Sequence, residues 1–171
     1  MIKPLVVILM GSKADSGHCQ KIAEVARQFG LEVVQRIGSA HKSPAHILRL
    51  LEEYESDPRP KVYITVAGRS NALSGFVDGA VKAPVIACPP PPTPPTPPEG
   101  GGRGGWADLY SSLRMPVGIA PGVVLEPANA ALLAAKILAL TSPEVMEQVQ
   151  IFQKQQTKKI LDDDAEYHDA A

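Results

Sequence analysis

Three short loops of this sequence carry residue types that could bind or transform a small anionic ligand. Residues 11–15 read Gly-Ser-Lys-Ala-Asp, residues 39–42 read Ser-Ala-His-Lys, and residues 67–71 read Ala-Gly-Arg-Ser-Asn. Hydroxyls, backbone N–H groups and a guanidinium bind phosphate or carboxylate, and an imidazole that titrates near neutral pH can transfer a proton. The loops indicate ligand binding with proton transfer, provided that the fold brings them together.

Each loop also has a structural interpretation. The first could hold phosphate with its backbone N–H groups and the Ser12 hydroxyl, with Asp15 on sugar hydroxyls, but a Gly-Ser turn followed by an acidic residue also caps an ordinary helix. Its glycine spacing is neither that of a Walker loop nor that of a dinucleotide fingerprint. His41 could be a capping residue, and residues 67–71 could form a surface turn in which Asn71 caps the next helix.

The elements that would hold these loops alternate along the chain. Short apolar runs predict strands over residues 5–9, 32–37, 61–66, 84–88 and 117–124, the last interrupted by Pro121. Stretches of helical period lie between them, a pattern typical of a parallel sheet with helices on both faces. We therefore expect an α/β fold, a three-layer α/β/α sandwich of the flavodoxin-like or Rossmann-like kind. Ligands bind outside the carboxyl ends of such strands, and all three loops follow a predicted strand.

Helix starts are predicted from caps and prolines. Ser43 and Pro44 begin the second helix, and Pro127 and Pro143 begin the last two. The Pro143 helix is expected to run to about residue 159, before an acidic tail that frays.

Helical spacing also predicts which side chains are buried. His18 and His46 are expected on the exposed parts of their helices, whereas the small side chains of residues 129–138 predict a closely packed face, within the domain or between subunits. Cys19 and Cys88 lack the spacing of a zinc site and are interpreted as buried, reduced thiols, so we expect no metal site.

Length and composition limit the function. With 171 residues, 44% of them hydrophobic, the chain favours one domain over residues 1–142, with residues 143–171 forming a terminal helix and tail of the same domain or of a subunit interface. The formal net charge of −1 gives no positive field for nucleic acid. No apolar run is long enough to span a bilayer, and the first ten residues lack the features of a secretion signal. We expect a cytoplasmic protein.

Residues 89–105 differ in composition from the rest of the chain, because eight of the 17 prolines lie between positions 89 and 98 and glycines follow. The segment is expected to form an elongated surface loop within the domain. The alternative interpretation is a ligand for an SH3-type or WW-type partner.

Four ordered motifs together resemble one family. The motifs are residues 11–15, 39–42, 66–71 and 111–116, and the last reads Ser-Ser-Leu-Arg-Met-Pro. They are similar to those of the phosphoribosylaminoimidazole carboxylases of purine biosynthesis, and the resemblance runs over about residues 6–140. In that family a mutase class typically carries Ser-Ala-His-Arg and Ala-Gly-Ala-Gly-Gly-Ala. The direct carboxylase class instead carries Ser-Ala-His-Lys and Ala-Gly-Arg-Ser-Asn. Lys42 and the third loop place this chain with the direct class.

The resemblance implies that 5-aminoimidazole ribonucleotide (AIR) and carbon dioxide join to give 4-carboxy-5-aminoimidazole ribonucleotide (CAIR), without a cofactor or metal. His41 would be the catalytic acid/base that removes the ring proton. The first loop is implied to bind the ribose phosphate and the third to surround carbon dioxide. The implied substrate-binding residues are Gly11, Ser12, Asp15, Ser39, Ala40, Lys42, Ala67, Gly68, Arg69, Ser70, Asn71 and Ala72, the last in place of the usual glycine.

The family also implies a homo-octamer with shared active sites, in which the last helix reaches a neighbouring subunit. Neither nucleic acid nor a membrane is an expected partner. Two alternatives remain: a mutase that moves the carboxyl group of N5-carboxyaminoimidazole ribonucleotide, and a non-catalytic nucleotide-binding or scaffold protein.

Overall fold

Five parallel strands form a single sheet in the order β2-β1-β3-β4-β5, in a computed structural model that describes residues 3–91 and 104–169. The strands are β1 (Leu5–Met10), β2 (Glu32–Ile37), β3 (Lys61–Val66), β4 (Val85–Ala87) and β5 (Gly122–Val123). This order is flavodoxin-like, and the direction in which strands are added reverses beside β1. The predicted α/β/α sandwich is confirmed.

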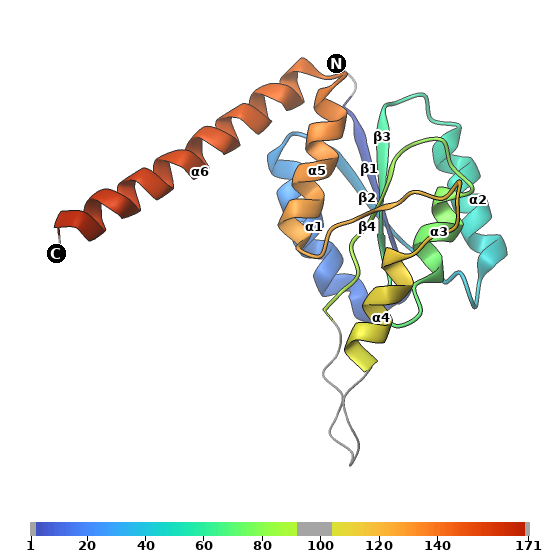
Figure 1. Cartoon of the computed structure of the whole chain (residues 1–171). Coiled ribbons are helices and arrows are strands. Elements are labelled where there is room, and N and C mark those ends of the chain that lie inside the picture. The colour runs from blue at the N-terminus through green and yellow to red at the C-terminus, as the bar shows by residue number, and fades with distance from the viewer. Residues whose placement is uncertain (1–2, 92–103, 170–171) are drawn as a thin grey trace, which may run out of the picture.

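Helices cover both faces of the sheet. One layer contains α1 (Ser16–Gln28) and α5 (Pro127–Ala139), and the other contains α2 (Pro44–Glu55) and α3 (Ala72–Asp78) (Figure 1). The side chains of β1 alternate between these layers, because successive residues of a strand point to opposite faces. Positions 6, 8 and 10 pack with α1 and α5, while positions 5, 7 and 9 pack with α2 and α3. A strand buried on both faces explains the uninterrupted apolar run.

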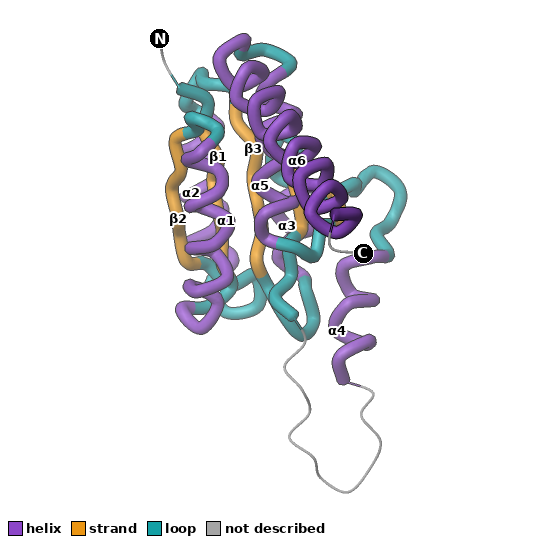
Figure 2. Tube along the Cα trace, turned by 90° about the vertical axis from the view of Figure 1, so that its left-hand side faces the viewer, coloured by secondary structure: helices purple, strands orange, loops and turns teal. Residues whose placement is uncertain are grey.

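The small-residue face of α5 lies inside the domain. Ala130, Ala131, Ala134 and Ala135 are fully buried, and α5 packs against α1 in the same chain. Figure 2 shows the two helices side by side over the strands. The close packing predicted for residues 129–138 is confirmed, and its partner is α1.

Two predicted elements are shorter than expected. The strand predicted over residues 117–124 is reduced to β5, because Gly118 has a left-handed φ of 96° and Pro121 has no N–H to donate to a ladder. The strand predicted over residues 84–88 loses one residue at each end. The middle of the predicted Pro/Gly segment, residues 92–103, lies outside the described residues.

Two helices differ from the prediction. The sequence analysis missed α4 (Gly104–Leu113), which packs against α3. The last helix, α6 (Pro143–Asp169), continues through the acidic segment where fraying was expected, and an ion pair between Lys158 and Asp162, one turn apart, supports it there.

Only the first part of α6 belongs to the domain core. Val145 and Val149 are buried against α5, and the Phe152 ring meets that of Phe29 edge to face, with ring centroids 5.4 Å apart. Beyond Phe152 every described side chain of α6 is exposed, and the helix projects away from the body (Figure 1). In the two described ranges, no helix is both long and apolar enough to cross a membrane.

One glycine is required by close packing rather than by a turn. A Cβ on Gly38, just after β2, would lie 2.7 Å from Cγ1 of the fully buried Ile47 in α2. We expect Gly38→Ala to lower the free energy of unfolding by about 1–3 kcal/mol, because the contact forces α2 away from the sheet. Urea unfolding at matched protein concentration measures this effect.

Gly17 provides the matched control for that substitution. It lies in α1, and a Cβ there would meet nothing within 4 Å. Gly17→Ala is expected to raise the free energy of unfolding by about 0.5–1 kcal/mol, since alanine loses less backbone entropy on entering a helix. Equal unfolding midpoints for the two variants would contradict the packing argument.

Candidate active site

The carboxyl ends of three strands meet at one edge of the sheet. Met10 of β1 is in register with Ile37 of β2 and with Val66 of β3. The pairing continues past the strands, because the Gly11 N–H donates to the Val66 carbonyl and the Gly38 N–H donates to the Met10 carbonyl, both at 2.9 Å. The turns predicted to form a site therefore lie side by side, with the first loop between the other two.

The first loop begins a helix and also faces this edge. The backbone N–H and the hydroxyl of Ser12 both donate to Oδ2 of Asp15, at 3.2 and 3.1 Å. A short 3-10 helix, η1 (Lys13–Asp15), then leads into α1. The capping interpretation is confirmed. It does not exclude ligand binding, because Ser12 is exposed and the N-terminus of α1 carries a partial positive charge.

The second loop is a tight turn with His41 at its crest. The Ser39 hydroxyl accepts from the Lys42 N–H at 3.2 Å, and the Ser39 carbonyl accepts from the Ser43 N–H at 2.8 Å. His41 and Lys42 are both exposed, and within the described part of the chain neither side chain has a hydrogen-bond or ion-pair partner. The imidazole nitrogens and the ammonium group are available to a ligand.

The third loop contains a strained residue. Arg69 has a φ of 57°, the one positive φ outside glycine among the described residues. Its side chain is exposed and has no ion-pair partner in residues 3–91 and 104–169. Gly68 lies against Pro90 at the exit of β4, where a Cβ would come within 3.3 Å of the Pro90 ring. The loop therefore lies between the ends of β3 and β4 and presents a guanidinium to solvent.

Asn71 belongs to the framework of the site. It is only 3% exposed, its Oδ1 accepts from the Ser74 N–H at 3.2 Å, and its Nδ2 donates to the hydroxyls of Ser74 and Ser112. The predicted helix cap is confirmed. The substrate contact implied for Asn71 stays a prediction, and its side-chain amide is hydrogen-bonded within the protein through both the oxygen and the nitrogen.

A histidine–cysteine contact near the same edge was missed. His18 was predicted to be exposed but is partly buried, with Nε2 3.3 Å from Sγ of Cys88. Burial lowers the pKa of His18, so the neutral imidazole is favoured. His46, also predicted to be exposed, is partly buried.

Both thiols are buried, as predicted, and burial raises the pKa of Cys19 and of Cys88 to about 12. Since the thiolate is the reactive form, we expect native protein at pH 8 to react with Ellman's reagent at least ~100-fold more slowly than protein unfolded in guanidinium. The rate at which the reagent releases its coloured thiolate, followed by absorbance, measures this difference. Native labelling at the unfolded rate would show that at least one thiol is accessible.

The arrangement can bind an anionic ligand and exchange a proton with it. A central loop with a helix N-terminus lies between the exposed imidazole of His41 and ammonium of Lys42 on one side and the exposed guanidinium of Arg69 on the other, and no partner of these groups lies among the described residues. Phosphate and carboxylate groups are stabilised by such groups. The fold defines a flavodoxin-like α/β protein, and the carboxyl ends of its strands carry a histidine-bearing candidate site for an anion.

Similarity to known proteins identifies the family. The pattern of the AIR carboxylase family matches residues 5–159. A phosphoribosylaminoimidazole carboxylase of Treponema denticola is 53% identical, covering 96% of this chain and 98% of the relative, and one of Archaeoglobus fulgidus is 48% identical, covering 94% and 83%. The crystal structure of Treponema denticola PurE has a TM-score of 0.86 at 54% identity, covering 96% of this chain and 98% of that one. The chain belongs to the AIR carboxylase family, as its motifs indicated.

The structure brings the loops of Gly11, of residues 39–42 and of residues 67–72 together, and the contacts of these loops with a ligand stay predictions. The sequence analysis missed the hydroxyls of Ser111 and Ser112. Both stand in a motif quoted only for the resemblance, so the signal was present but had no structural interpretation.

Proposed function

We propose that the chain catalyses the direct carboxylation of AIR by carbon dioxide to CAIR. The observation that carries this proposal is the placement of the exposed His41 imidazole, which has no partner in the part of the chain that the structure describes, on a turn beside the helix N-terminus of the first loop. A ribonucleotide whose phosphate lies at that N-terminus would bring its base toward the neighbouring turns. Lys42 in the second loop and residues 69–71 in the third support the direct class.

The proposed reaction balances without a further reactant. C4 of the electron-rich aminoimidazole attacks the carbon of carbon dioxide, a C–C bond forms, and one C=O electron pair moves onto oxygen to give a carboxylate. A nitrogen of His41 then takes the proton from C4, and the C–H electrons restore the aromatic ring. Lys42 and Arg69 stabilise the phosphate and the new carboxylate. Proton transfer and orientation are what the protein supplies.

The assay that tests this function uses purified protein with AIR and bicarbonate, without ATP or a partner synthetase. CAIR formation, followed by ultraviolet absorbance, is the expected result. Turnover that instead requires N5-carboxyaminoimidazole ribonucleotide would identify a mutase. Ribonucleotide binding without turnover of either compound would identify a non-catalytic binding protein and refute the proposal.

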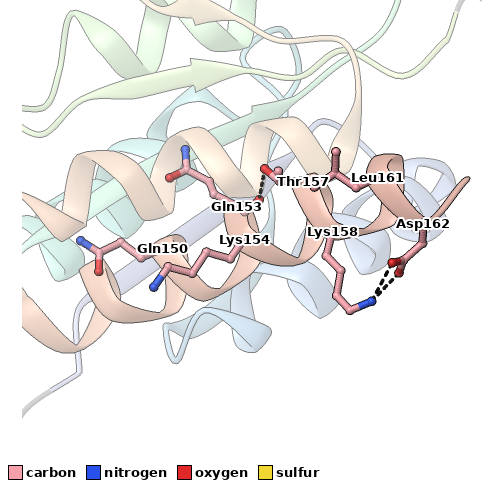
Figure 3. Close-up of a pocket in the computed structure, with 7 residues that line it drawn as sticks. All are labelled: Gln150, Gln153, Lys154, Thr157, Lys158, Leu161 and Asp162. Atoms are coloured by element: carbon pink, nitrogen blue, oxygen red, sulfur yellow. Dashed lines mark hydrogen bonds and ion pairs between the residues drawn. The ribbon is translucent and has the colours of Figure 1, made fainter. Parts of the chain in front are cut away.

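We further propose that α6 docks on a neighbouring subunit of a homo-octamer, so that residues 143–171 serve both the domain and an interface. Ile160, Leu161 and Tyr167 are 66%, 64% and 82% exposed, which is unfavourable for apolar side chains of an isolated helix. An open pocket lies along α6, and a neighbouring subunit would fill it; Figure 3 shows the side chains that line it. It is lined by Gln150, Gln153, Lys154, Thr157, Lys158, Leu161 and Asp162.

The octamer has a direct test. Light scattering is expected to give a mass eight times that of the chain, and truncation after Phe152 is expected to lower it. A mass equal to one chain would refute the assembly and leave the proposed reaction to be judged by its own assay.

A further inference from the structure

The C-terminal turn of α4 contacts the strained third loop. The Ser111 hydroxyl oxygen accepts from the Asn71 N–H at 2.9 Å and lies 3.0 Å from the Arg69 carbonyl and 2.7 Å from the Asp108 carbonyl. Its single proton can be donated to either carbonyl. The Ser111 side chain therefore contacts the loop on both sides of Ser70, by a hydrogen bond from Asn71 and at hydrogen-bond distance from Arg69.

The next residue of α4 holds the same loop from inside the protein. Ser112 is 1% exposed and accepts from Nδ2 of Asn71 at 2.9 Å. The same amide nitrogen donates to the Ser74 hydroxyl at 2.8 Å, and that hydroxyl lies 2.7 Å from Oγ1 of Thr65 in β3. A continuous buried network thus links α4, the loop and the central sheet. Among the described residues, every buried side-chain nitrogen or oxygen has a partner.

The loop needs such support because its conformation is unfavourable by itself. A residue with a side chain in the left-handed region persists only where its surroundings hold it, and Arg69 has a φ of 57°. Within the loop, the local hydrogen bond is that of the Ala72 N–H to the Ser70 carbonyl, at 3.0 Å. The side chains from outside the loop that contact it next to Ser70 are those of Ser111 and Ser112 in α4.

We propose that Ser111 and Ser112 are positioning residues, which hold the Arg69–Asn71 loop in the conformation that receives carbon dioxide or the new carboxylate. They act through Arg69, Ser70 and Asn71 and do not touch substrate themselves. The identity of the ligand in this proposal rests on the proposed function, whereas the role of the two serines in holding the loop conformation does not. It makes α4 part of the active site, although α4 lies outside the three loops that resemble the family's site.

Steady-state kinetics test the proposal. Alanine is a good helix former, and position 111 is a partly exposed helix position. Ser111→Ala is expected to raise KM for carbon dioxide at least about tenfold, while KM for AIR stays within about twofold. Ser111→Thr retains the hydroxyl and is expected to recover activity to within about threefold of the wild type. A purely structural role would instead lower the apparent kcat in proportion to the folded fraction, and with it kcat/KM for both substrates alike, and would leave both KM values unchanged.

Ser142→Ala is the matched control. Ser142 is buried and, like Ser111, hydrogen-bonded through its hydroxyl, here to Glu144 and to the Val145 N–H. It lies just before α6, which begins at the opposite edge of the sheet (Figure 1). Its kinetic parameters are expected to stay within about twofold of the wild type. Equal losses in Ser111→Ala and Ser142→Ala would overturn the positioning role.

Amide exchange separates this proposal from the proposed reaction. In Ser111→Ala the Asn71 N–H loses its acceptor and is expected to exchange at least about tenfold faster, while the Gly11 N–H, bonded to Val66, is unchanged. Wild-type protein without turnover would refute the reaction and leave this result standing. An unchanged Asn71 exchange rate would overturn the proposal, whatever the activity.

Discussion

Replacing His41 with asparagine is expected to lower kcat by about 10²–10⁴-fold, because the side chain proposed to accept the ring proton can no longer do so. The substitution leaves the tight turn intact, since the hydrogen bonds of that turn come from Ser39, Lys42 and Ser43 and not from the imidazole. AIR binding is expected to stay within about tenfold of the wild type, as phosphate and ribose contacts remain. Steady-state turnover and calorimetric titration with AIR measure the two quantities.

His46→Asn is the matched control for that experiment. His46 lies in α2, within the same stretch of chain, and receives no role in the proposed chemistry. Its variant is expected to retain kcat within about twofold, since histidine and asparagine have similar helix propensities. Near-normal turnover in His41→Asn would remove His41 from the mechanism, and an equal loss in both variants would indicate damage to α2.

Replacing Asp15 with alanine is expected to weaken AIR binding by about 10–100-fold, through loss of a charged acceptor for the ribose hydroxyls. The variant also loses the two hydrogen bonds from Ser12, so the free energy of unfolding is expected to fall by about 1 kcal/mol. Calorimetric titration and thermal unfolding separate the two effects.

Asp15→Asn distinguishes a ribose contact from a capping role. Its amide oxygen can still accept from Ser12, so the stability is expected to recover, whereas the negative charge of Asp15 is gone. The affinity of Asp15→Asn for AIR is expected to lie between that of the alanine variant and that of the wild type. Unchanged affinity in Asp15→Ala would count against the ribose contact and leave only the cap observed in the structure.

Much of the site could be predicted because its chemistry lies in contiguous loops. Residues 39–42 follow one apolar run and precede Ser43 and Pro44, and these local signals alone place His41 at a strand-to-helix turn. The buried run of residues 5–9 indicated a parallel sheet, and parallel strands bring their carboxyl ends to one edge. The register of Met10 with Ile37 and Val66 confirms that step.

Other features depended on packing between distant segments. Asn71 was predicted both as a helix cap and as a substrate contact, and its hydrogen bond to Ser112, 41 positions later, shows that the side-chain amide is also part of a buried network. The exposure predicted for His18 was wrong for the same reason, since Cys88 lies 70 positions away. No local pattern distinguishes a free amide or imidazole from one that a remote side chain covers.

By itself, the sequence determined the strands, the helix starts and the three loops, because apolar period, caps and prolines act over a few neighbouring residues. The tertiary structure decided that α4 is a helix beside the third loop, that Gly38 must lack a side chain against Ile47, and that Arg69 holds a left-handed conformation. Each of these depends on which distant atoms come within contact distance, and that is a property of the folded chain.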